Sequence, residues 1–181
     1  TFKPNNSITR AEFVTIFNKV FGLTQTSDKT FNDTLNHWAK NEIDIAVTNG
    51  VCQGTSDTTF EPNAPITREQ AAKMIANYKK ISDMHNKING YNDGSQTANW
   101  AINEVEAILE AGYMNGYSDT NTFKPKNNIT RAEAVVTLGR VIANPNPVMP
   151  EPPVPTEPVT PPTTNPTPNP PTNSGGNGLT N

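Results

Sequence analysis

A twelve-residue motif occurs three times in this chain of 181 residues and limits what the chain can fold into. The motif reads TFKPNNSITRAE at residues 1–12, TFEPNAPITREQ at residues 59–70 and TFKPKNNITRAE at residues 122–133. The copies align without gaps and begin 58 and 63 residues apart. Such spacing is typical of a tandem repeat, in which each unit folds as one supersecondary element and buries its apolar face against its neighbours.

A second pattern precedes the last two copies and sets the limits of the unit. Phe31-Asn32-Asp33 matches Tyr91-Asn92-Asp93. An offset of 62 residues relates the other matched positions, which are Trp38-Ala39, Gly50 and Gly54 on one side and Trp100-Ala101, Gly112 and Gly116 on the other. The unit is therefore about 60 residues long. We predict the rear half of a first repeat at residues 1–26, a second repeat at 27–88, a third at 89–144 and a linker at 145–181.

Each unit reads as a front helix and a rear helix joined by a loop, so the predicted fold class is mainly α. Front helices are expected from Trp38 to about Asn49 and from about Trp100 to Ala111. The first of them has Asn36 as its expected N-cap and Gly50 as a left-handed residue at its end. The first rear helix has the spacing of one buried face, with apolar residues at Phe13, Ile16, Phe17, Val20 and Phe21.

The end of the motif has the sequence of a capping box. In a capping box, a threonine side chain and a Glu or Gln three residues later satisfy each other's backbone amides. The pairs are Thr9 with Glu12, Thr67 with Gln70, and Thr130 with Glu133. The motif therefore predicts that a rear helix starts after each threonine.

The arginine after each threonine has no such explanation. Arg10, Arg68 and Arg131 stand at the first helical position, where the helix dipole disfavours a cation by roughly 0.3–1 kcal/mol. The residues three and four positions later are not acidic. Either each arginine pairs with a carboxylate of a nearby loop, such as Asp57 or Asp119, or it joins free helix amides in holding an external anion. The residues alone leave both interpretations open.

Two repeated pairs are further candidates for function. Trp38 and Trp100 open the front helices, where a tryptophan is more often part of the core. A partly exposed indole would instead offer a stacking surface for a sugar. Gly54 and Gly116 are expected to provide tight turns or a close approach of two backbone segments.

Composition separates the repeats from the tail. Thirteen of the seventeen prolines lie in residues 145–171, so residues 145–181 are expected to form a disordered Pro/Thr/Asn-rich linker. A net charge of −3 without a basic run argues against nucleic acid as a partner, and no apolar run is long enough for membrane insertion. We predict no catalytic residues, no metal site and no cofactor, and we assign the lone Cys52 to core packing.

Taken together, these features resemble the S-layer homology repeat. The residues that carry the resemblance are Phe/Tyr-x-Asp, Trp-Ala, the two glycines, Phe-x-Pro and Ile-Thr-Arg-Ala-Glu, and they cover residues 1–143. The resemblance implies three repeats arranged as a pseudo-threefold α-helical spindle. It also implies binding to a secondary cell-wall polysaccharide, often bearing ketal-linked pyruvate, and an extracellular location in the cell wall or S-layer of Gram-positive and related bacteria.

The resemblance also implies a set of ligand-binding residues in grooves between repeats. The motif arginines are expected to meet the acidic sugar, and the tryptophans and glycines match positions near the grooves. The full set is Arg10, Arg68, Arg131, Trp38, Trp100, Gly54 and Gly116.

Two departures from the family pattern affect these expectations. The second motif reads Arg-Glu-Gln, which places Glu69 beside Arg68 and is expected to weaken that site for an anion. The first repeat has no front half in this sequence, so one groove is expected to be incomplete. Apolar residues of the first rear helix, such as Phe13 and Phe17, are expected to be less covered for the same reason.

We therefore expect a noncovalent cell-wall anchor and not an enzyme, with a cargo domain fused outside this chain. One alternative is the anchoring module of an exported hydrolase whose catalytic domain lies outside this chain. The other is a structural S-layer lattice module that binds no sugar.

Overall fold

A computed structural model describes residues 1–82 and 85–147, and within these ranges the chain is helical, as predicted. The α-helices are α1 (Arg10–Phe21), α2 (Lys40–Thr48), α3 (Arg68–Lys79), α4 (Ile102–Glu110) and α5 (Arg131–Ala143). Short 3-10 helices are η1 (Asn32–Thr34), η2 (Lys87–Gly90), η3 (Gly94–Gln96) and η4 (Asn99–Ala101). The predicted linker, apart from residues 145–147, lies outside the described residues.

The rear helices α1, α3 and α5 begin where the capping boxes predict. In α1, the Thr9 hydroxyl accepts the Glu12 amide at 3.2 Å, and the Glu12 carboxylate accepts the Thr9 amide at 3.0 Å. The same reciprocal pair opens α3 and α5. α1 ends before Gly22, whose φ of 65° lies in the left-handed region that glycine adopts without strain. Local sequence thus determines both ends of this helix.

The front helices α2 and α4 have less conventional starts. Ala39 is the N-cap of α2, so the expectation of Asn36 in that role was wrong. The His37 Nδ1 atom accepts the Ala39 amide at 3.1 Å, so a histidine ring satisfies a backbone donor at the start of this helix. The left-handed conformation predicted for Gly50 is confirmed, and Gly112 after α4 shares it, each with a φ of 70°.

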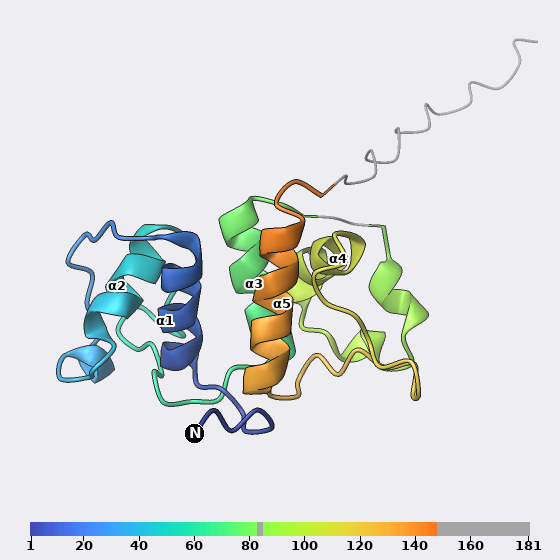
Figure 1. Ribbon diagram of the computed structural model, residues 1–181, viewed down its shortest axis with the longest axis horizontal. Helices are drawn as coiled ribbons and strands as arrows, with labels where there is room; N and C mark the ends of the chain where they lie inside the picture. The colour runs from blue at the N-terminus through green and yellow to red at the C-terminus, as the bar shows by residue number, and fades with distance from the viewer. Residues whose placement is uncertain (83–84, 148–181) are drawn as a thin grey trace, which may run out of the picture.

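The three motif copies meet in a closed ring of backbone hydrogen bonds. Ile8 donates to the carbonyl of Ile129 at 3.2 Å, Ile129 donates to Ile66 at 3.0 Å, and Ile66 donates to Ile8 at 3.0 Å. All three side chains are fully buried. Figure 1 shows α1, α3 and α5 running in the same direction, with their first turns at the edge where the motif loops gather. The spindle arrangement itself stays a prediction, and this ring supports it.

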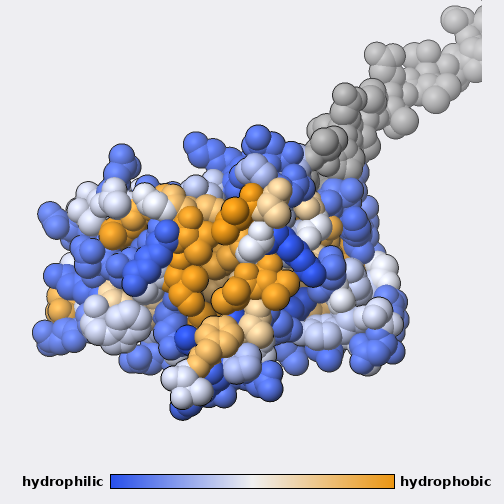
Figure 2. Space-filling view, in the orientation of Figure 1, coloured by the Kyte–Doolittle hydropathy of each residue, from blue (hydrophilic) through white to orange (hydrophobic). Residues whose placement is uncertain are grey.

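Each front helix covers the rear helix of the preceding repeat. α2 packs on α1 and α4 packs on α3, whereas no front helix among the described residues packs on α5. Equivalent positions show the consequence, because Val14 of α1 and Ala72 of α3 are fully buried while Val135 of α5 is 47% exposed. Val136 and Ile142 are exposed on the same helix. In the view of Figure 2, apolar surface gathers over the middle of the molecule, around α1 and α5.

The uncovered apolar surface therefore lies mainly on α5, although Val20 of α1 is also 37% exposed. The expectation that Phe13 and Phe17 would be poorly covered was wrong, because both side chains are fully buried. The Phe17 ring also meets Tyr78 of α3 edge-on, with 5.2 Å between ring centroids. The front half of the second repeat covers α1, and a front half before the first motif would have α5 as its partner.

Candidate ligand-binding groove

Arg10 reaches from the first turn of α1 into the loop of the second repeat. Its Nε atom donates to the Phe60 carbonyl at 2.9 Å, and its Nη2 atom donates to the Gln53 carbonyl at 3.3 Å. The guanidinium carbon lies 4.6 Å from the centroid of the Phe60 ring. The residue is buried, at 4% exposure. Carbonyls and an aromatic ring stabilise the guanidinium, but they carry no charge that neutralises it.

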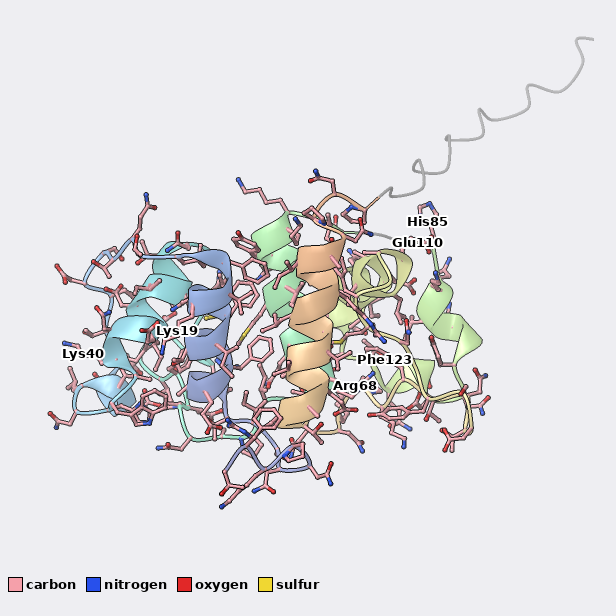
Figure 3. The ribbon with its side chains drawn as sticks, viewed as in Figure 1. Lys19, Lys40, Arg68, His85, Glu110 and Phe123 are labelled. Atoms are coloured by element: carbon pink, nitrogen blue, oxygen red, sulfur yellow. The ribbon has the colours of Figure 1, made fainter. Side chains whose placement is uncertain are left out.

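Arg68 holds the same place between α3 and the third repeat. Its Nε atom donates to the Phe123 carbonyl at 2.8 Å, its Nη2 atom donates to the Asn115 carbonyl at 2.8 Å, and its Nη1 atom lies 3.5 Å from a Glu133 carboxylate oxygen. Figure 3 shows Arg68 and Phe123 next to each other beside α5. This arginine is as buried as Arg10, yet it has a carboxylate partner.

Arg131 closes the cycle between α5 and the first motif. Its Nε atom donates to the Phe2 carbonyl at 2.9 Å, and its Nη1 atom donates to Glu12 at 2.9 Å. It is the most exposed of the three arginines, with a side-chain exposure of 25%. Of the two interpretations left open by the sequence, pairing with a loop carboxylate such as Asp57 or Asp119 is not what these contacts show. The partners are backbone carbonyls of the following repeat and, for two arginines, the glutamate of its capping box.

The helix amides beside these arginines already have protein acceptors. The Arg10 amide donates to the Ala64 carbonyl at 2.9 Å, and the Ala11 amide donates to the Pro62 carbonyl at 3.0 Å. The third amide belongs to the capping box. α3 and α5 repeat the pattern, using the carbonyls of Asn127, Pro125, Asn6 and Pro4. Free helix amides were expected to help hold an anion, but these amides are occupied, so side chains would have to do so.

A cavity of about 610 Å³ lies beside Arg10. It brings together three residues predicted from the sequence, Arg10, Gly54 and Trp100, which come from the first, second and third repeats. The remaining lining residues are Cys52, Gln53, Thr55, Gln70, Lys73, Met74 and Asn77. Small-molecule sites typically measure roughly 300–1,000 Å³, so the cavity is large enough for a sugar unit.

The lining of this cavity is positively charged. Arg10 and Lys73 contribute positive charge, and none of the described lining residues is a carboxylate. Lys73 forms an ion pair with Glu104 at 2.6 Å and donates to the Trp100 carbonyl at 3.0 Å. Glu104 therefore offsets the charge of Lys73 at contact distance, whereas none of the described carboxylates lies within ion-pair distance of Arg10. Arg10 is the cation that an incoming anion would meet.

Burial shifts the pKa of two groups in this cavity. It lowers the pKa of the Arg10 guanidinium from its ordinary value, and Cys52, Glu61 and Asp33 act in the opposite direction. A bound anion would also favour the charged guanidinium. Burial raises the pKa of the Cys52 thiol to about 12, so the thiol stays protonated at neutral pH. This protonation agrees with the packing role assigned to Cys52 from the sequence.

The repeated glycines allow a close approach of backbone and ring. A Cβ atom on Gly54 would lie 2.3 Å from the Ser56 carbonyl oxygen and 2.5 Å from the Phe31 ring. A Cβ atom on Gly116 would lie 2.0 Å from the Tyr91 ring. All three distances are too short for any side chain, so the predicted structural role of these glycines is confirmed. Their role in binding a ligand stays a prediction.

The tryptophans are not core residues. Trp38 is 65% exposed and Trp100 is 50% exposed, so the interpretation of these side chains as core was wrong and the exposed platform is the arrangement found. Trp100 lines the cavity, but Trp38 does not. The Trp38 ring lies beside His37, with 5.3 Å between ring centroids. The structure therefore separates the two tryptophans instead of bringing them to one site.

Sequence reasoning missed the wall of the cavity that α3 supplies. Lys73, Met74 and Asn77 line it together with Gln70, which had been assigned to helix capping alone. A signal was present, because Gln70, Lys73 and Asn77 follow one another at intervals of three and four residues and therefore share one face of α3. Nothing in the sequence indicated that this face would meet Arg10 of another repeat.

Two other kinds of site find no support in the described part of the chain. Within residues 1–82 and 85–147, no helix has the length and apolar character needed to cross a membrane. The same residues contain no group of three or more His, Cys, Asp or Glu side chains placed to hold a metal ion.

Comparison with known proteins identifies the class of protein to which this fold belongs. Residues 1–14, 30–72 and 90–135 match the S-layer homology domain, so the chain belongs to that family. The three matched segments contain the motif copies and the patterns upstream of the second and third. Membership confirms the resemblance seen in the sequence.

Three relatives illustrate where this domain occurs. A cellulosome-anchoring protein of Acetivibrio thermocellus is 34% identical over 77% of this chain and 33% of its own length. A surface-layer 125 kDa protein of Lysinibacillus sphaericus is 31% identical over 79% of this chain and 12% of its length. An endoglucanase of a Bacillus species is 33% identical over 78% of this chain and 15% of its length. The chain thus spans a third or less of these relatives. The family and the surface-layer relative agree with the predicted extracellular, cell-wall location.

Proposed function

We propose that this chain anchors its protein noncovalently to the bacterial cell envelope by binding an acidic secondary cell-wall polysaccharide whose acidic group is ketal-linked pyruvate. The observation that carries the proposal is the cavity in which Arg10, Gly54 and Trp100 meet. The guanidinium of Arg10, which has no ion-pair partner among the described residues, suits a carboxylate. The half-exposed indole of Trp100 suits the apolar face of a sugar ring.

Each of the three repeats contributes a different group to the proposed binding site. Arg10 presents its guanidinium to the pyruvate carboxylate, because a charge-assisted hydrogen bond to a carboxylate is among the stronger polar contacts in proteins. Trp100 stacks against the sugar ring, and Gln53, Gln70 and Asn77 contribute polar groups to the cavity lining beside it. No covalent chemistry is needed for anchoring, which fits the non-catalytic character of this domain.

The remaining predicted residues do not line this cavity. Arg68, Arg131, Trp38 and Gly116 stay predictions as ligand contacts. Cargo fused outside this chain is part of the proposal, since the relatives carry most of their length beyond the matched region. The endoglucanase relative favours one version of the proposed function, in which the anchored cargo is an exported hydrolase.

Binding to isolated cell-wall sacculi that carry the polymer tests the proposal. Sacculi of an S-layer-bearing Gram-positive bacterium are split into two samples, and one sample is treated with mild acid to hydrolyse the pyruvate ketals. We expect the chain to sediment with untreated sacculi and to lose roughly tenfold or more in affinity for treated sacculi, because one charge-assisted contact is lost.

A control keeps the loss specific to the acidic group. Sacculi that carry no pyruvate ketals from the start should bind the chain equally before and after the acid step. Equal binding to both samples of the pyruvylated sacculi would contradict the proposal and favour the lattice module that binds no sugar.

A further inference from the structure

The three motif arginines differ in what the following repeat places against them. Glu133 lies 3.5 Å from Arg68, and Glu12 lies 2.9 Å from Arg131. The equivalent position in the second repeat is Gln70, because this copy reads Arg-Glu-Gln. Arg10 therefore shares its cavity with a neutral amide, and none of the described carboxylates lies within ion-pair distance of it.

A second difference between the repeats is the residue that comes directly after the repeated glycine, Gly54 or Gly116. After Gly116 comes Tyr117, whose ring centroid lies 4.9 Å from the Arg68 guanidinium and whose hydroxyl donates to Glu133. After Gly54 comes Thr55, which lines the open cavity beside Arg10. The smaller threonine leaves space at the position where a tyrosine ring covers the other guanidinium.

The carboxylate at Arg68 is firmly held as an anion. The pKa of Glu133 lies below its ordinary value, because burial raises it less than the hydrogen bonds from Tyr117 and Thr130 and the charge of Arg68 lower it. Glu133 is therefore ionised at neutral pH, and an external carboxylate approaching Arg68 would meet a like charge. Glu12 gives Arg131 the same internal partner.

We infer that Arg10 is the arginine that receives the acidic sugar and that Gln70 and Thr55 decide this selection. The inference rests on the proposed function and adds to it the groove that binds and the two residues that determine it. The grooves of Arg68 and Arg131 are neutralised from within by Glu133 and Glu12, so each chain offers one strong site for the carboxylate.

Gln70→Glu is the variant that tests the electrostatic half of this inference. Glutamate occupies the same position in the other two motif copies, so the capping box and the fold are expected to survive. The probe is a hexose glycoside bearing ketal-linked pyruvate, compared with the same glycoside without it, by isothermal titration calorimetry. For the unmodified chain we expect one site per chain and preference for the pyruvylated probe. Gln70→Glu should weaken that binding roughly tenfold or more, because the new carboxylate competes for Arg10.

Thr55→Tyr tests the steric half. It places in the second repeat the residue that the third repeat has at Tyr117, and it should weaken binding of both glycosides because it fills the cavity. Gln25→Glu is the matched control, since it makes the same chemical change at an exposed loop position away from the cavity. This control should bind the pyruvylated probe as the unmodified chain does.

The outcomes separate the inference from the proposed function. Preference for the pyruvylated probe in the unmodified chain, lost in Gln70→Glu and kept in Gln25→Glu, supports both. Preference that persists unchanged in Gln70→Glu, or a stoichiometry of three sites, overturns the inference and leaves the proposed function standing. No preference in the unmodified chain, together with equal binding to acid-treated and untreated sacculi, overturns both.

Discussion

Replacing Arg68 with alanine is expected to lower the free energy of unfolding by roughly 2–4 kcal/mol, more than any other single change to the motif arginines. The guanidinium donates to the carbonyls of Phe123 and Asn115, both at 2.8 Å, and is 4% exposed. Alanine would leave these acceptors without their donor and remove the cation that faces Glu133. Urea denaturation followed by far-ultraviolet circular dichroism measures the change.

Arg131→Ala provides the matched comparison. This arginine makes one carbonyl contact and one ion pair, and its side chain is 25% exposed, so water can replace its partners. We expect a loss below about 1 kcal/mol, as for other solvent-exposed pairs. If Arg68→Ala were no more destabilising than Arg131→Ala, the arginine would not be tying α3 to the third repeat, and it would be available to a ligand.

Adding a front half-repeat ahead of Thr1 is expected to stabilise the domain by roughly 2–4 kcal/mol. The added segment is a copy of residues 27–58, which precede the second motif directly in the chain. Its helix should cover α5 as α2 covers α1, because Val135 is 47% exposed where its equivalent Val14 is fully buried. Burial of Val135, Val136 and Ile142 provides the expected gain. Thermal melting of the extended and unextended chains measures it.

Val135→Asp distinguishes docking on α5 from a general effect of the extension. In the unextended chain the side chain is half exposed, so aspartate should change the melting temperature little. In the extended chain it should abolish most of the gain, because it would bury a charge in the new interface. An extended chain that melts at the unextended temperature would mean that the added half does not pack on α5.

Local sequence predicted the elements of this fold more reliably than their partners. Thr9 and Glu12 form a capping box from residues three apart in the chain, and such contacts can be read from a short window. Asn36 failed as a predicted cap because His37, one residue later, satisfies the Ala39 amide with its ring. No local pattern distinguishes these two possibilities.

The candidate site was predictable residue by residue but not as an assembly. Arg10, Gly54 and Trp100 were each singled out by repetition, yet they come from three different repeats. Repetition treats Trp38 and Trp100 as equals, whereas the cavity includes only Trp100. Gln70 was assigned to helix capping, and its further importance depends on sharing a cavity with an arginine sixty positions earlier, which only the packing of the repeats shows.

The central claim is that the guanidinium of Arg10 receives the carboxylate of the bound sugar. Nitrogen-15 NMR of the arginine Nε–H groups, recorded while the pyruvylated hexose glycoside is added, tests it most directly. We expect a saturable shift of the Arg10 resonance, small changes at Arg68 and Arg131, and no shift with the unsubstituted glycoside. A saturable shift at Arg68 or Arg131 with none at Arg10 would contradict the claim.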